Sequence, residues 1–217
     1  MFLGHHAVAL ASKRIAPRAQ LGWLVVAATF LDLLWPICLL LGIEHAKVRP
    51  NAGSPFLNLD FVSYPWTHSA VMALGWSVLL GLVYWLITRY KRGAIVIGIG
   101  VFSHWVLDWA SHIPDMPLWP GGPKYGLGLW KWPAATIEIE TALLLLGVAI
   151  YMRATRPLRR RGTIGLVALV VFLFVAFALS IVSPPPPSEQ ALGWGGMLGW
   201  VLIAFPWWVD RNREAVG

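Results

Sequence analysis

The sequence predicts an all-α protein, a polytopic membrane helical bundle with about six transmembrane helices and a re-entrant half-helix at the N-terminus. Of the 217 residues, 58% are hydrophobic and 12% are charged, and the mean hydropathy is +0.65. These values lie far outside the range of ordinary soluble domains. Basic residues alternate between the loops, and His and Asp recur inside apolar segments. We therefore expect a single membrane domain over residues 1–217.

Six apolar segments are about long enough to cross a hydrocarbon core of ~30 Å, which takes about 20 helical residues. They cover residues 21–43, 67–88, 93–113, 135–152, 163–182 and 191–209. The segments between them are rich in Pro, Gly or charge, as is typical of loops. The N-terminal stretch GHHAVALASKR is too short to cross, so we expect it to form the half-helix.

The basic residues indicate the orientation of the chain. Six spans would place thirteen of the 17 on one side, namely Lys13, Arg14, Arg18, Arg89, Lys91, Arg92, Arg153, Arg156, Arg159, Arg160, Arg161, Arg211 and Arg213. The positive-inside rule makes this side cytoplasmic, together with both termini. The net charge of +7 is then a signal of topology and of anionic lipid headgroups, and we expect no nucleic-acid partner.

Polar side chains from three segments are expected at one depth. At ~1.5 Å per residue from the cytoplasmic end of each span, Asp32 and His104 both lie about 16 Å into the membrane, near the midplane. The half-helix would lift His5 and His6 to a similar level, roughly 12–14 Å. The sequence therefore predicts that these side chains converge inside the bundle.

The third span carries further polar residues toward its outer end. His104, Asp108 and His112 follow one another at intervals of four and share one helix face, and His68 opens the second span at the outer level. An Asp in the middle of a span costs about 2.5–3.5 kcal/mol on insertion scales, so it normally has a partner. Imidazole and carboxylate together suit zinc, manganese or iron. We expect a divalent metal ion, zinc first, in a cavity that opens outward; the alternative is hydrogen bonding between helices without a metal.

Other polar residues have simpler interpretations. His45, at the outer end of the first span, is interpreted as an interfacial residue. Glu138 and Glu140 open the fourth span two residues apart and therefore on different faces, so at most one can face the cavity. The last two spans contain no ionisable residue. We therefore expect residues 1–134 to form the metal-site half and residues 135–217 to form scaffold helices.

The external loop 114–134 is long for a connection and is punctuated by Pro and Gly. Its Trp residues, Trp119, Trp130 and Trp132, are typical of a membrane interface. We expect this loop to be an ordered lid over the mouth of the cavity.

Four motifs carry a family resemblance. FLGHHAVA at the N-terminus, FLDLLWP in the first span, WTHS opening the second and SHWVLDWASHIPD closing the third resemble small bacterial inner-membrane proteins described as membrane-bound metal-dependent hydrolases. The resemblance covers about residues 1–130. It implies a location in the bacterial inner membrane and a metal site made of His5 or His6, Asp32, His68, His104 and Asp108. Leu34 and Tyr64 stand where that pattern has a further acid and often a His, which favours one ion, or one ion with a weaker second one.

The polar residues and the resemblance together predict metal-assisted hydrolysis. A metal ion held by these His and Asp residues would make hydroxide available at neutral pH. Asp32, with Glu138 as the second candidate, would accept the proton, and His112 would orient a ligand or protonate the leaving group. A site walled by Trp and Leu suits a lipid-like or amphiphilic ester or phosphoester that arrives from the outer side.

Two other functions remain open at this point. A small-solute or proton-coupled transporter would also place His and Asp near the midplane, although it usually needs access from both sides. A non-catalytic subunit of a larger membrane complex, or a homo-oligomer, would use the Trp-rich surface for docking. Membrane lipid is an expected partner under every hypothesis.

Overall fold

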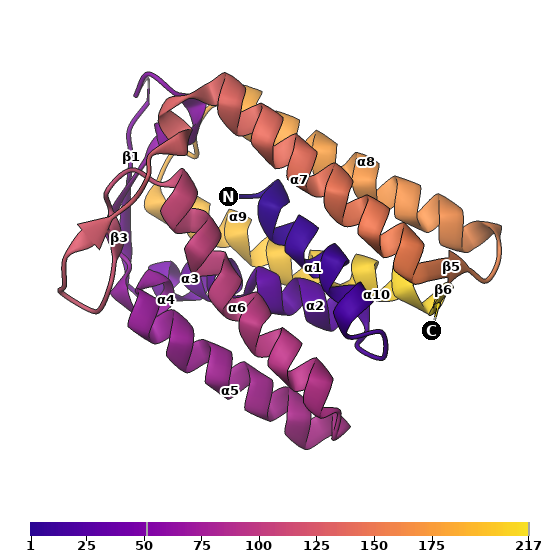
Figure 1. Cartoon of the computed structure of the whole chain (residues 1–217). Coiled ribbons are helices and arrows are strands. Elements are labelled where there is room, and N and C mark those ends of the chain that lie inside the picture. The colour runs from indigo at the N-terminus through magenta and orange to yellow at the C-terminus, as the bar shows by residue number, and fades with distance from the viewer. Residues whose placement is uncertain (51, 217) are drawn as a thin grey trace.

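The structure, a computed structural model that describes residues 1–50 and 52–216, confirms the all-α membrane bundle (Figure 1). Within these residues, five helical stretches are long and apolar enough to cross a membrane: α5 (Ala70–Thr88), α6 (Lys91–Ser111), α7 (Pro133–Ala154), α8 (Arg160–Val182) and Glu189–Arg211, which comprises α9 (Glu189–Leu202) and α10 (Ala204–Arg211). A sixth span results if α2 (Leu21–Ala28) and α3 (Phe30–Leu40) are counted as one.

The expected half-helix is α1 (Leu3–Ile15), which lies in the interior of the bundle (Figure 1). It packs closely on α7 because Gly147 has no side chain: a Cβ there would lie 2.6 Å from the Ala7 carbonyl oxygen. Small residues allow such close backbone approach in membrane bundles. The Leu3 and Gly4 N–H groups, which have no partner inside the helix, donate to Glu140 of α7 at 2.6 and 3.4 Å. Helix α7 therefore holds α1 in place.

The first span is broken between α2 and α3, which are bent by 57°. The Thr29 hydroxyl at the break donates to the Val25 carbonyl oxygen at 2.8 Å. Pro36 lies inside α3 and lacks an N–H, so the carbonyl of Asp32 loses its usual helical donor. Broken helices in membranes free backbone carbonyls for other contacts, and here the break lies one turn before Asp32.

Short strands, which we did not predict, occur in the loops at both ends of the bundle. At one end, named here the hairpin end, β1 (His45–Val48) pairs with β2 (Leu59–Ser63), and β3 (Met116–Pro117) pairs with β4 (Lys124–Tyr125), all antiparallel. The same end holds the short helices η1 (Pro55–Leu57), α4 (Pro65–His68) and η2 (Leu129–Lys131). At the opposite end, β5 (Thr155–Pro157) pairs with β6 (Arg213–Ala215).

The loop 114–134 is fastened to the end of α6. The Gly128 N–H donates to the His112 carbonyl oxygen at 2.7 Å. A Cβ at Gly126 would lie 2.1 Å from the Ile113 carbonyl oxygen, so only glycine fits this contact. The loop is therefore an ordered element packed on the hairpin end.

A buried ion pair joins both ends of the chain near β5 and β6. Lys13 Nζ of α1 lies 2.6 Å from Asp210 Oδ2 of α10, and both side chains are buried. The Tyr151 hydroxyl of α7 donates to Asp210 Oδ1 at 2.8 Å, and the Leu21 N–H at the start of α2 donates to Oδ2 at 3.0 Å. Asp210 therefore connects α1, α2 and α7 to α10.

Candidate metal centre

The structure brings five of the expected residues together in the middle of the bundle. They form the His/Asp cluster: His5 of α1, Asp32 of α3, His68 at the end of α4, and His104 and Asp108 of α6. Two overlapping groups, one of His68, His104 and Asp108 and one of His5, Asp32 and His104, each place three potential ligand atoms within 4.8 Å of one another. His104 belongs to both groups, so the cluster has the residues to hold a metal ion around this imidazole.

The ligand atoms are spaced like ligands of one ion. His104 Nε2 lies 3.0 Å from Asp108 Oδ2 and 3.6 Å from Asp32 Oδ1. His68 Nε2 lies 3.7 Å from Asp108 Oδ2 and 3.5 Å from Asp32 Oδ1. Two atoms that are each about 2.1 Å from a tetrahedral ion lie about 3.4 Å from each other. His104 Nε2 is buried and makes no hydrogen bond among the described residues, although Asp108 Oδ2 lies at ion-pair distance from it.

The other ring nitrogen of His104 is fixed by the break in the first span. His104 Nδ1 lies 2.9 Å from the carbonyl oxygen of Ala28, the last residue of α2. Because a carbonyl only accepts, Nδ1 carries the proton and donates. In the neutral imidazole, Nε2 then presents its lone pair to the cluster, which is the tautomer that a metal ligand needs.

His68 is oriented in the same way by a chain of two hydrogen bonds. The Thr67 hydroxyl donates to Glu44 Oε2 at 2.7 Å and so accepts from His68 Nδ1, also at 2.7 Å. Glu44 is fully buried and also accepts from the N–H groups of Trp66 and Thr67 at 2.7 and 2.9 Å. This chain of carboxylate, hydroxyl and imidazole leaves His68 Nε2 facing the cluster. Our sequence reasoning missed Glu44 and Thr67; the Thr directly before His68 in WTHS was the available signal.

Asp108 is the most heavily contacted carboxylate of the cluster. His5 Nε2 lies 3.1 Å from Asp108 Oδ1, and the Met1 amine contacts the same oxygen. The His5 ring stacks on the His104 ring with centroids 3.8 Å apart and planes 4° from parallel. His5, His68, His104 and Asp108 are buried, whereas the side chain of Asp32 is 50% exposed. Asp32 is therefore the member of the cluster that a small molecule can reach.

Asp32 faces a cavity of about 500 Å³. His5, His6 and Thr29 line it near Asp32, and apolar residues of α8 and α9 form much of the remaining wall. His6 Nδ1 lies 3.1 Å from the Phe2 carbonyl oxygen, and His6 belongs to neither ligand group. The helices that we expected to be scaffold therefore border the cluster through this cavity.

His112 lies at the hairpin end, outside both ligand groups. Its Nδ1 is 3.0 Å from Asp115 Oδ1, and its ring lies against Trp130 with centroids 4.0 Å apart. The Tyr64 hydroxyl donates to the same Asp115 oxygen at 3.1 Å. Burial, reinforced by the Asp115 charge, raises the pKa of Tyr64 well above its usual value, so the hydroxyl stays a donor. Tyr64, through Asp115, and Trp130 thus hold His112 in place at the hairpin end.

The structure does not bring Glu138 to the cluster. Glu138 is exposed on α7, whereas Glu140 is buried against the start of α1. Residues two apart on a helix point in different directions, so only one of them faces inward. The inward residue is Glu140, and it caps α1.

The fold and the cluster define a class of protein: a polytopic helical membrane protein with buried His and Asp groups that could hold a metal ion. The profile of the family described as YdjM inner membrane protein matches residues 1–184, and the chain belongs to this family. The match includes every residue of the His/Asp cluster and supports a location in the bacterial inner membrane. No curated protein and no solved structure gives a significant match.

Proposed function

We propose that the protein is a metal-dependent hydrolase of the inner membrane that acts on a lipid-like ester or phosphoester. The observation that carries the proposal is His104 Nε2, which is buried, faces two carboxylates and has no hydrogen-bond partner among the described residues. Without a metal, this nitrogen would have to carry a proton and donate it to Asp108 Oδ2, 3.0 Å away, as the alternative of hydrogen bonding alone requires. A metal ion explains both the unpaired atom and the spacing of its neighbours.

His68, His104 and Asp108 are the ligand set that we propose. All three are buried, and both imidazoles are held with Nε2 toward Asp108. Two imidazoles and a carboxylate are typical of catalytic zinc, which uses three protein ligands and keeps a position open; manganese and iron accept the same ligands. When bound, such an ion lowers the pKa of water to about 7 and polarises the bond to be cleaved.

Asp32 is positioned to accept a proton from the attacking water. Its Oδ1 lies 3.5 Å from His68 Nε2 and 3.6 Å from His104 Nε2, and half of its side chain is exposed to the cavity. A carboxylate in this place can take a proton from a water beside the ligand set and return it to the leaving group. His5, stacked on His104, keeps both His104 and Asp108 oriented. We assign no step to His112 or Glu138.

The expected result is metal-dependent turnover of chromogenic amphiphiles. Purified protein loaded with zinc is offered p-nitrophenyl palmitate and p-nitrophenyl hexadecyl phosphate. Asp32→Asn should lower kcat by roughly 10²–10⁴-fold, the usual contribution of a general base, with zinc content retained. Asp60→Asn, at a partly exposed position on β2, should leave kcat unchanged. Failure of the zinc-loaded parent to hydrolyse either probe would contradict the hydrolase assignment.

We also propose that the C-terminus and the Lys13 end of α1 face the cytoplasm, whereas Met1, at the other end of α1, lies inside the bundle at Asp108. Lys13 and Arg213 lie at the end that holds β5 and β6, together with the basic loop before α8, whereas the hairpin end carries few basic residues. The positive-inside rule then makes the β5–β6 end cytoplasmic. A reporter fused after Gly217 that is active only in the periplasm would be the contrary result.

A further inference from the structure

The cavity beside Asp32 lies among α1, α3, α8 and α9. In Figure 1, α8 runs behind α7 and α9 runs behind α1, so these two helices close the bundle on one side. Leu198 and Leu202 of α9 line the cavity and are 62% and 44% exposed. The cavity is therefore accessible from the face that a membrane protein turns toward lipid.

The polar and apolar groups of the cavity are separated. Its ionisable residues are His5, His6 and Asp32, all on α1 and α3. The residues from α8 and α9 carry no polar side chain; they include Leu169, Phe172, Leu173, Leu192 and Leu198. His5 Nδ1 is buried and has no hydrogen-bond partner among the described residues. This separation matches an amphiphile whose polar head meets Asp32 and whose chain lies between α8 and α9.

Three glycines of α9 line the cavity: Gly195, Gly196 and Gly199. A Cβ at Gly196 would lie 2.4 Å from Pro36 Cγ, and one at Gly199 would lie 3.1 Å from Leu33 Cδ2, so these glycines are used for packing on α3. A Cβ at Gly195 would meet no atom within 4 Å. Of these glycines, only Gly195 leaves open space, so it is the position on α9 beside which an alkyl chain could lie.

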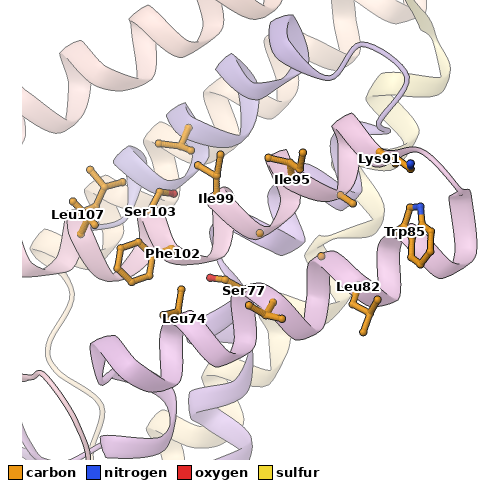
Figure 2. Close-up of a pocket in the computed structure, with 16 residues that line it drawn as sticks. Leu74, Ser77, Leu82, Trp85, Lys91, Ile95, Ile99, Phe102, Ser103 and Leu107 are labelled. Atoms are coloured by element: carbon orange, nitrogen blue, oxygen red, sulfur yellow. The ribbon is translucent and has the colours of Figure 1, made fainter.

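A larger groove of about 910 Å³ runs between α5 and α6 (Figure 2). Its serine hydroxyls are both used within their own helices: Ser77 donates to the Ala73 carbonyl oxygen and Ser103 to the Gly100 carbonyl oxygen, each at 2.7 Å. This groove therefore presents a largely apolar face to lipid. Its one ionisable lining residue is Lys91, at the exposed start of α6, so the groove has no His or Asp like those of the cavity at Asp32.

We propose that the cavity binds a single-chain membrane amphiphile that enters sideways from the bilayer, with its ester or phosphoester head at Asp32 and its chain beside Gly195. The inference rests on the proposed function for the reacting head group and adds the substrate class and its route. A chain that stays in the hydrocarbon region never has to enter water, so sideways access avoids the cost of exposing its apolar surface. Gly195 is then the residue that admits the chain.

Photolabelling tests the proposal without requiring turnover. Protein in nanodiscs, with and without chelator, is irradiated with a lysophosphatidylcholine that carries a diazirine near the end of its chain. We expect saturable labels on α8 and α9, displaced by unlabelled lysophosphatidylcholine. Gly195→Leu should reduce this labelling about tenfold or more, because the added side chain occupies the cavity.

Gly75→Leu is the matched control. Gly75 is an exposed glycine on spanning helix α5; it has no atom within 4 Å of a Cβ position and does not line the cavity. This variant should label like the parent. A thermal melt of both variants verifies that each is folded.

The possible results test the binding of the amphiphile in the cavity separately from its hydrolysis. Labelling of α8 and α9 that depends on Gly195, in a protein that hydrolyses nothing, would support the binding site and overturn the hydrolase assignment. Labels spread over all lipid-facing helices, absent from the cavity or unaffected by Gly195→Leu would overturn the inference, even if chromogenic esters are hydrolysed. Equal displacement by a two-chain phosphatidylcholine would overturn the single-chain assignment.

Discussion

His104→Ala is expected to abolish stoichiometric binding of a divalent metal ion. His104 is shared by both ligand groups, so its loss leaves each with two ligand atoms instead of the three that catalytic sites use. Elemental analysis after equilibration with zinc and dialysis should find one ion per parent chain and none in the variant. Chelation should also lower the Tm of the parent, because a ligand at 100 times its Kd stabilises the folded state by about 2.7 kcal/mol. Chelation should not change the Tm of the variant.

His45→Ala is the control for this loss, since His45 is half exposed and lies outside both ligand groups. It should retain one ion per chain. A parent protein that contains no stoichiometric metal and keeps its Tm on chelation would refute the metal centre, and the hydrolase proposal with it.

A variant with a smaller expected effect on metal affinity tests the hydrogen bond that orients His68. Thr67→Val keeps the shape of the side chain but removes the hydroxyl that joins Glu44 to His68. Removing such a supporting hydrogen bond typically weakens metal affinity about 10- to 100-fold. Thr136→Val is the matched control, because Thr136 is equally buried and its hydroxyl donates only to backbone carbonyls. Equal affinities for the two variants would show that the Thr67 hydroxyl does not support a ligand.

A large loss of folding stability is expected for a substitution far from the cluster, at Asp210. Asp210→Ala removes the carboxylate that holds Lys13, Tyr151 and the Leu21 N–H, and it leaves the Lys13 ammonium buried with the Ala19 carbonyl oxygen as its remaining acceptor. Breaking a buried ion pair from one side costs about 3–5 kcal/mol of unfolding free energy. Unfolding in mixed micelles with increasing dodecyl sulfate measures the change.

Glu214→Ala removes a comparable ion pair in an exposed place. Glu214 Oε1 lies 2.7 Å from Arg156 Nε, yet both side chains are largely exposed, so this change should cost about 0–1 kcal/mol. Lys13→Met added to Asp210→Ala should restore part of the lost stability, because it removes the unpaired charge. Equal costs for Asp210→Ala and Glu214→Ala would refute the assigned role of Asp210.

The depth of the polar residues could be predicted because it depends on one helix at a time. A fixed rise per residue places Asp32 and His104 at the same level, and the length of the half-helix does the same for His5. The structure has all three in one ligand group. The four-residue spacing of His104 and Asp108 likewise predicts a shared face without any knowledge of neighbouring helices.

Contacts that depend on the path of a loop could not be predicted. Glu44 and Thr67 are separated by 22 residues that contain β1 and β2, and only this hairpin brings the carboxylate to the hydroxyl. Glu138 was predicted as the second candidate for the base, and the sequence could not decide between it and Glu140 for a related reason. Their spacing shows that they face different ways, but the position of α1 decides which one lies inside.

The sequence by itself determined the membrane class, the approximate number of spans and the level of each polar side chain, because the thickness of the bilayer and the rise of a helix act on each segment separately. Only the tertiary structure decided which side chains face one another, how the first span breaks to free the Ala28 carbonyl for His104, and that α8 and α9 wall the cavity at Asp32. The physical reason is that the rotation and tilt of a membrane helix are set by its packing against its neighbours, which hydropathy and spacing along one segment do not contain.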